Sequence, residues 1–354
     1  MIDLYSMTKE ELGSFVAELG EGRFRADQLW LWLLKGTPID EMSNLSKAFR
    51  EKLKATVTPT LPEVEEKYVS RIDGTVKYLF RLYDGECIES VLMRYEHGNT
   101  LCISTQVGCR MGCRFCASTL AGRVRDLLPS ELLGQMIAAE RDSGERISNI
   151  VMMGIGEPLD NYDNVIRFLR LVGSPDGLNI GYRHISLSTC GVVPGIRKLA
   201  EERFPITLSI SLHATTDEKR SEIMPVNKKW CIRELLDACV DYYRSCGRRI
   251  SFEYTLIRGK NDGAEDARAL ATLLKNAFRG TDAPIHVNLI RVNEVEETGM
   301  KAGTVDSAKS FADILNRLGV VATVRRRLGS DVNAACGQLR RSAAQRECAS
   351  SAKT

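Results

Sequence analysis

The stretch Cys109-Arg-Met-Gly-Cys113-Arg-Phe-Cys116 carries three cysteines at spacings of four and three residues. A structural zinc site takes four protein ligands, so three thiolates on one short loop leave such a site incomplete. A 4Fe–4S cluster has one ligand position per iron, and three cysteines would leave one iron open to a small molecule. The stretch therefore predicts an iron–sulfur cluster with an open iron. The alternatives are a chance grouping of cysteines and a zinc knuckle completed by a distant residue.

The flanks of this loop indicate where it lies in the fold. Residues 101–106 form a short β-like run before it, so the loop would follow the carboxyl end of a strand. Enzymes built on α/β barrels place their chemistry at that end. The CxxxCxxC pattern, with Phe115 directly before its last cysteine, resembles the motif of the radical S-adenosylmethionine (SAM) superfamily. In that superfamily the open iron binds SAM through its amino and carboxylate groups.

The composition bounds the kind of protein and its location. The 354 residues, 44% of them apolar, can bury the core of one large domain with an appendage. The sequence shows neither an apolar run long enough to cross a bilayer nor the pattern of a signal peptide. Eleven cysteines, clustered instead of spread as a framework, indicate a reducing compartment. We therefore expect a cytoplasmic protein without a membrane partner. We also expect a monomer. The net charge of +3 is too small to identify a nucleic-acid partner.

Residues 1–60 predict a helical accessory domain that binds RNA. Apolar residues recur at helical spacing between residues 7 and 55, with Thr8 or Ser6 as the first cap. One interpretation of the second helix is a helix–helix core formed by Leu29, Trp30 and Leu33. The other is a basic, aromatic edge that faces RNA, formed by Arg23, Phe24 and Arg25.

The rest of the chain predicts an α/β fold. Residues 61–95 look like a small β-meander linker with hairpin turns at Asp73-Gly74 and Asp84-Gly85. Strands and helices alternate over residues 96–339, which indicates a parallel sheet with crossover helices, an incomplete barrel of the (βα)6 type. The tail, residues 340–354, reads as disordered and basic. The strand-like runs lie near residues 101–106, 147–153, 184–189, 206–212, 249–257, 284–291 and 320–326.

Polar and small residues follow several of these strands. Gly154-Ile-Gly-Glu157 matches the Gly-Glu element with which radical SAM enzymes hold the amino group of SAM, so Gly156 and Glu157 are expected SAM contacts. Later strand ends carry hydroxyl, imidazole and amide groups suited to ribose and carboxylate oxygens. The SAM contacts expected there are Ser188, Ser211, Leu212, His213 and Asn293. Taken alone, His213 could instead be a core histidine and Asn293 an ordinary strand cap.

Motifs along nearly the whole chain resemble the RlmN family of dual-specificity RNA methyltransferases. They are Cys102-Ile-Ser-Thr-Gln-Val-Gly-Cys109, Gly154-Ile-Gly-Glu-Pro-Leu-Asp-Asn161, Ser209-Ile-Ser-Leu-His-Ala214 and Ala334-Ala-Cys-Gly-Gln-Leu339. The resemblance implies methylation of adenine carbon 2, in 23S rRNA at the peptidyl transferase centre and in tRNA next to the anticodon. It also implies one 4Fe–4S cluster per subunit on Cys109, Cys113 and Cys116, SAM as methyl donor and radical source, and an electron donor of the flavodoxin or ferredoxin type.

The resemblance also assigns a covalent carrier. Carbon 2 of adenine is electrophilic and cannot attack the sulfonium methyl of SAM. In the family, the cysteine matched by Cys336 accepts a methyl group, and this group adds to the ring after a SAM-derived radical has removed one of its hydrogens. Glu89 matches the acceptor of the ring proton. The thiol matched by Cys102 then attacks the sulfur of Cys336 and leaves a disulfide that is reduced in each turnover. Without the family, Glu89 could equally be a solvent-facing strand carboxylate.

Two other functions stay open at this point. A Cfr-type enzyme would use the same machinery to methylate carbon 8 of the adenine, although Gln106-Val-Gly-Cys109 and the continuation to Asn161 favour the carbon-2 family. An iron–sulfur or zinc RNA-binding module without catalysis would have no use for Cys102 and Cys336.

Overall fold

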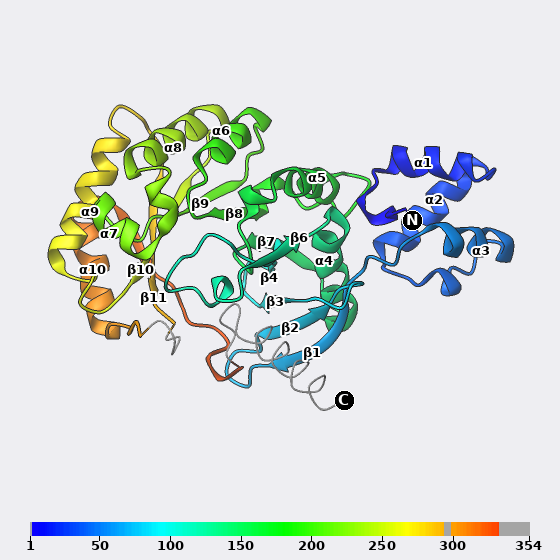
Figure 1. The fold of residues 1–354 in the computed structure, drawn as a ribbon, viewed down its shortest axis with the longest axis horizontal. Helices are drawn as coiled ribbons and strands as arrows, with labels where there is room; N and C mark the ends of the chain where they lie inside the picture. The colour runs from blue at the N-terminus through cyan, green and yellow to red at the C-terminus, as the bar shows by residue number, and fades with distance from the viewer. Residues whose placement is uncertain (1, 294–298, 333–354) are drawn as a thin grey trace.

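The computed structural model describes residues 2–293 and 299–332. Its centre is a ten-stranded sheet in the order β1-β2-β3-β4-β7-β8-β9-β10-β11-β12. From β4 to β12 every neighbouring pair is parallel, which confirms the predicted incomplete barrel (Figure 1). The strands of the parallel part are β4 (Asn99–Cys102), β7 (Ile147–Met152), β8 (Ile185–Thr189), β9 (Thr207–Ser211), β10 (Ile250–Leu256), β11 (Ile285–Arg291) and β12 (Val321–Val324).

Helices connect the parallel strands and cover the outside of the sheet (Figure 1). Except for the short helix Asp217–Ile223, they contribute to one large core, because apolar residues recur on one face of each of these helices and along the strands. Among the described residues, no helix is both long enough and apolar enough to span a membrane. The helices are α4 (Pro129–Ser143), α5 (Tyr162–Gly173), α6 (Val193–Glu202), α7 (Asp217–Ile223), α8 (Ile232–Cys246), α9 (Ala264–Ala277) and α10 (Val305–Arg317).

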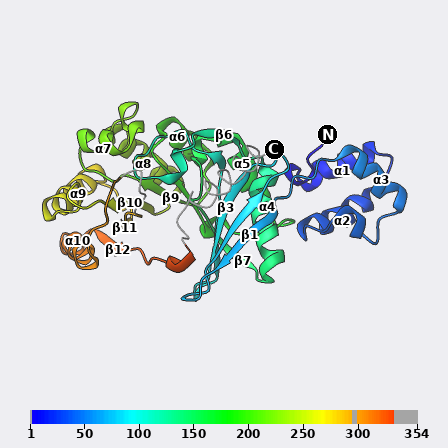
Figure 2. The ribbon, with the colours of Figure 1, turned by 60° about the horizontal axis from the view of Figure 1, so that its bottom comes forward.

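The meander joins the barrel sheet directly. Its strands β1 (Glu63–Val69), β2 (Val76–Arg81) and β3 (Cys87–Met93) are antiparallel, and β3 pairs with β4. Figure 2 shows these strands as a long extension beside the barrel. Side chains alternate along them, so Tyr78 and Phe80 enter the main core while Lys77 and Glu89 lie on the other face.

The N-terminal helices form a separate small core at one end of the molecule (Figure 1). Thr8 caps the first helix as predicted, because its hydroxyl accepts from the Glu11 N–H (3.2 Å) and the Glu11 carboxylate accepts from the Thr8 N–H (2.8 Å). Leu29, Trp30 and Leu33 are buried between the helices, which confirms the predicted helix–helix core. The helices are α1 (Lys9–Glu18), α2 (Arg23–Leu34) and α3 (Lys47–Thr56).

After the last barrel strand the chain returns to the turn between β1 and β2. The Asp331 carboxylate accepts from the Ser70 hydroxyl (2.7 Å) and from the Arg71 N–H (2.9 Å). In the opposite direction, the Asp73 carboxylate accepts from the Gly329 N–H (2.9 Å). These hydrogen bonds fix the segment that precedes residue 333 against the meander.

Candidate active site

The cysteine loop is closed at its base by a small hairpin. Strands β5 (Gln106–Gly108) and β6 (Arg123–Asp126) pair on either side of it, and the Cys109 N–H donates to the Gly122 carbonyl (2.9 Å). Inside the loop, the Thr119 hydroxyl lies within hydrogen-bond distance of the Cys113 (3.2 Å) and Cys116 (2.9 Å) carbonyls. The loop is therefore held by backbone hydrogen bonds at its base and by the Thr119 hydroxyl inside it.

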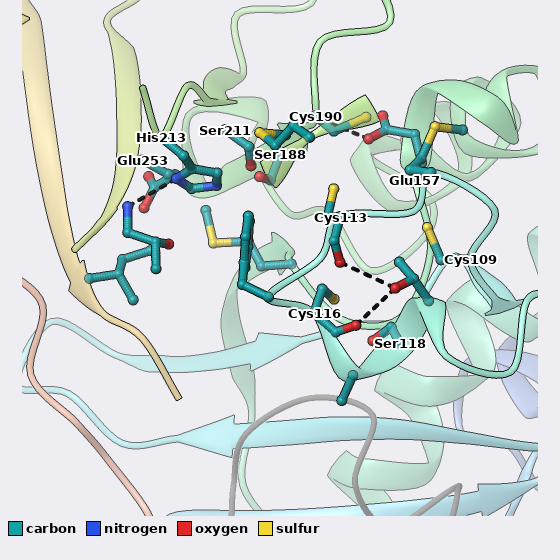
Figure 3. Close-up of a pocket in the computed structure, with 18 of the residues that line it drawn as sticks. Cys109, Cys113, Cys116, Ser118, Glu157, Ser188, Cys190, Ser211, His213 and Glu253 are labelled. Carbon is teal, nitrogen blue, oxygen red and sulfur yellow. Dashed lines mark hydrogen bonds between the residues drawn. The ribbon is translucent and has the colours of Figure 1, made fainter. Parts of the chain in front are cut away.

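Cys109, Cys113 and Cys116 line one cavity of about 270 Å³ at the carboxyl ends of the barrel strands (Figure 3). Within the described residues, no three His, Cys, Asp or Glu side chains converge on a point where they could hold a single metal ion. A 4Fe–4S cluster does not need such convergence, because each cysteine binds a different iron. The donor set, three thiols on one loop, therefore fits a cluster with one open iron.

Burial raises the pKa values of these thiols. It raises the pKa of Cys109 to about 12 and that of Cys113 well above its ordinary value. Thiolates are the metal-binding form, so the positive charge of the iron must offset this desolvation when the ligands lose their protons. Cluster assembly at this site is thus coupled to proton release.

Gly156 and Glu157 form the turn that faces the cysteine loop. Gly156 has φ 109°, and a Cβ there would lie 2.7 Å from the Gln106 N atom, so the turn requires glycine. The buried Glu157 carboxylate accepts from the Cys190 (2.7 Å) and Leu159 (3.1 Å) N–H groups. Burial raises its pKa. These bonds aim the carboxylate into the cavity, where an ammonium group could donate to it (Figure 3).

His213 is held in one tautomer at the far wall of the cavity (Figure 3). Its Nδ1 accepts from the Thr255 N–H (2.9 Å), so the ring proton is on Nε2. Burial lowers its pKa to about 3, which keeps the ring neutral. The Phe115 ring packs edge to face against the His213 ring, with 4.8 Å between the two ring centres. This contact links the cysteine loop to the cavity wall.

The other expected SAM contacts fall into two groups. Ser188, Ser211 and Asn293 line the same cavity as the cysteines. Leu212 lies behind the wall, since its side chain is fully buried in the main core. Its N–H donates to the Glu253 carbonyl (3.1 Å), and its carbonyl accepts from Arg220 (3.1 Å).

Glu89 and Cys102 lie on neighbouring strands, on the same face of the sheet. Cys102 is opposite Val91 and buried beside it, and Glu89 precedes Val91 by two residues. Glu89 is 3% exposed and forms an ion pair with the Lys77 ammonium (3.0 Å), which is itself fully buried. The interpretation of Glu89 as a solvent-facing carboxylate is therefore wrong. The predicted carrier Cys336 lies outside the described residues.

Replacing Lys77 with methionine should destabilise the protein, because it leaves the Glu89 carboxylate buried without its cation. We expect the free energy of unfolding to fall by about 3–5 kcal/mol. The double variant Lys77→Met/Glu89→Leu should recover much of this loss. Urea unfolding of the three proteins measures both effects, and equal stabilities of the single variant and the parent would contradict a tight ion pair.

Sequence reasoning missed three residues in and behind the cavity wall. Cys190 and Glu253 line the cavity, and Arg220 is fully buried behind it. Glu253 left a signal, since a carboxylate in the middle of the otherwise apolar run of β10 is unusual. Arg220 left none, because the helix Asp217–Ile223 is mostly charged and looks solvent-exposed.

The barrel, the three-cysteine loop and the Gly-Glu turn define a radical SAM enzyme, and residues 103–271 match the radical SAM superfamily. Residues 2–58 match the N-terminal domain of ribosomal RNA large subunit methyltransferases. The chain belongs to the RlmN family of radical SAM RNA methyltransferases, whose members use a 4Fe–4S cluster and SAM.

Individual relatives support this placement over nearly the full length. A "probable dual-specificity RNA methyltransferase RlmN" of Clostridium botulinum (strain Eklund 17B / Type B) is 52% identical over 97% of both chains. One from Alkaliphilus oremlandii is also 52% identical, over 96% of this chain and 98% of the relative. A crystal structure of a radical SAM methyltransferase from Sphaerobacter thermophilus superposes with a TM-score of 0.89 at 40% identity, covering 96% of this chain and 99% of that one.

Proposed function

We propose that this enzyme methylates carbon 2 of adenine in 23S rRNA, at the peptidyl transferase centre, and in tRNA next to the anticodon. The observation that carries the proposal is the shared cavity. Cysteines 109, 113 and 116 line it together with Glu157 and His213, and Glu89 and Cys102 lie on the first strands of the same sheet. This arrangement offers a place for a cluster and for SAM in one cavity, and a carboxylate and a thiol on adjoining strands of the same sheet.

The side chains divide the work as follows. Cys109, Cys113 and Cys116 hold the cluster, and the SAM ammonium group donates to Glu157. Ser188, Ser211, His213 and Asn293 offer polar groups to the rest of SAM, with Gly156 and Leu212 contributing through their backbone. When bound, the reduced cluster supplies the electron that cleaves SAM to an adenosyl radical.

Side chains of the protein carry out the covalent steps. Cys336 accepts the methyl group, and the carbon of that group bonds to carbon 2 once it has lost a hydrogen. The radical adduct then gives up one electron, for which the oxidised cluster would be the acceptor. Glu89 accepts the proton released from the ring carbon. The Cys102 thiolate attacks the sulfur of Cys336 and forms a disulfide, while the electron pair of the broken carbon–sulfur bond stays on the methylene carbon. That carbon takes up a proton to become the methyl group, and the methylated RNA is released. The electrons that reduce this disulfide and the cluster come from a flavodoxin- or ferredoxin-type donor. The enzyme acts as a monomer in the cytoplasm.

Mass spectrometry of the product tests the proposal. The enzyme, reconstituted anaerobically, is given SAM, a reductant and 23S rRNA or tRNA fragments. We expect 2-methyladenine in both RNAs. If 8-methyladenine formed instead, the enzyme would be of the Cfr type, and product from rRNA alone would remove tRNA from the proposal.

We also propose that the N-terminal helices, residues 1–60, contribute affinity for RNA. Phe24 is 59% exposed, and the Arg25 guanidinium lies 4.8 Å from the centre of its ring, beside the exposed Arg23. This pair of a stacked aromatic and a cation suits an unpaired base next to phosphates.

The double variant Arg23→Gln/Phe24→Ser should therefore weaken RNA binding. Loss of one stacked ring is worth about 1–3 kcal/mol, or roughly fivefold or more in dissociation constant. Loss of one phosphate contact should lower the salt slope by about 1. The control is Arg268→Gln on the exposed side of α9, at the opposite end of the molecule (Figure 1). Unchanged affinity in the double variant, measured by fluorescence anisotropy, would make the helices purely structural.

A further inference from the structure

Arg220 of α7 is a fully buried cation directly behind the cavity wall. Its guanidinium donates to the carbonyls of Cys190 (2.7 Å), Ser211 (3.0 Å) and Leu212 (3.1 Å). These carbonyls lie at the ends of β8 and β9, the strands that bring Ser188 and Ser211 to the cavity. One side chain thus ties together two neighbouring strand ends of the site.

Arg220 lacks a direct counter-charge in the part of the chain that the structure describes. Among the described residues its remaining hydrogen bond goes to the Asn227 side-chain oxygen (2.9 Å), and no carboxylate of residues 2–293 or 299–332 forms an ion pair with it. The Asp217 carboxylate is one step removed, since it accepts from the amide of Asn227 (3.0 Å). A buried charge without a paired charge is strongly unfavourable, so we expect a negative group nearby in the working enzyme.

The cysteine loop lies on the same side as this cation. The Arg114 N–H donates to the Ile223 carbonyl at the end of α7 (2.9 Å), and Cys113 packs in one small apolar cluster with Ile223 and Met224. Cys190, whose carbonyl accepts a hydrogen bond from Arg220, belongs to the same cluster as Cys113. The cation is thus close enough to influence a ligand sulfur.

We propose that Arg220 is the buried counter-charge of the iron–sulfur cluster and raises its reduction potential. The inference rests on the cluster assignment of the proposed function. Three thiolates give the cluster a net negative charge, and the one electron accepted from the donor adds another. A fixed positive charge behind Cys113 stabilises the reduced form more than the oxidised form, because net charge and local electrostatics set such potentials. Arg220 acts through the cluster ligands and is a positioning residue.

The test compares variants that keep or remove the charge. Arg220→Lys keeps it, and Arg220→Met removes it at a similar length. The midpoint potential of the anaerobically reconstituted cluster is measured by redox titration with electron paramagnetic resonance. We expect Arg220→Met to lower the equilibrium constant for reduction at least tenfold, which is about 59 mV for one electron. Arg220→Lys should lower it less than threefold. The control is Arg141→Met, which removes an arginine that donates to the Gly36 carbonyl far from the site.

The outcomes separate this inference from the proposed function. If Arg220→Met had the same midpoint potential as the parent, the proposed role of Arg220 would be wrong, and the cluster assignment would be unaffected. If the unmutated enzyme contained no iron after reconstitution, the cluster assignment itself would be wrong. If Arg220→Met assembles no cluster, Arg220→Gln replaces it, and equal potentials for Arg220→Gln and Arg220→Lys would overturn the proposal. Loss of the cluster in Arg220→Lys would also overturn it, since shape and not charge would then be required.

Discussion

Cys102→Ala should convert the enzyme from a catalyst into a trap for its substrate. In the proposed mechanism, the methylene group on Cys336 bonds to carbon 2, and the RNA is then attached to the protein through a carbon–sulfur bond that a base cannot break. Release needs a second thiolate that attacks sulfur, and Cys102 lies on β4, on the same face of the sheet as Glu89. The variant should still methylate Cys336 and cleave SAM, but it should accumulate a stoichiometric protein–RNA adduct and lose multiple turnover.

Denaturing gels and mass spectrometry of the intact complex measure this adduct. Cys246→Ala on α8 is the matched control, because it removes a cysteine far along the chain from the site motifs and should turn over normally. Cys336→Ala should form neither adduct nor methyladenine. Normal turnover by Cys102→Ala without an adduct would refute the division of labour between Cys102 and Cys336.

Cys113→Ala should abolish cluster assembly. Two thiolates cannot hold a cubane that needs a ligand at each of three irons, so iron should fall from about four per chain to below one. The fold should persist, because Cys113 belongs to a small apolar cluster at the barrel mouth and not to the main core. SAM cleavage on reduction should become undetectable.

Cys190→Ala is the matched control for this loss. Cys190 is buried in the wall of the same cavity but lies outside the three-cysteine loop. Iron content and visible charge-transfer absorbance should stay near the parent values in this variant. If Cys113→Ala kept its iron, or if Cys190→Ala lost it, the assignment of the three ligands would be wrong.

Local patterns predicted the elements better than their pairing. The apolar runs found the parallel strands because such strands are buried on both faces. The run 101–106 was too long, since the chain leaves β4 at Cys102 and starts β5 at Gln106. Between them the Thr105 N–H donates to the Ile155 carbonyl, a tertiary contact without a local signal. The pairing of β3 with β4 depends in the same way on the assembled sheet.

For the site, too, the sequence predicted some residues, while others became evident only in the folded structure. Motif spacing predicted the cysteine loop, and the resemblance to radical SAM enzymes added Glu157 and His213, which line the same cavity. It placed Leu212 among the SAM contacts, although the structure leaves only its backbone near the wall. The burial of Arg220 and of the Lys77–Glu89 pair could not be predicted, since charged residues are normally solvated and only the packed fold encloses them.

The anchoring of Asp331 to the β1–β2 turn has a kinetic consequence for Cys336. Cys336 follows Asp331 by five positions, so its Cα can lie at most about 18 Å from the Cα of Asp331. A thiol joined to an anchored residue by so short a segment is confined to a small volume, in which its effective concentration is on the order of millimolar. On the proposed mechanism its encounter with Cys102 is then intramolecular, and the rate of disulfide formation should not depend on enzyme concentration.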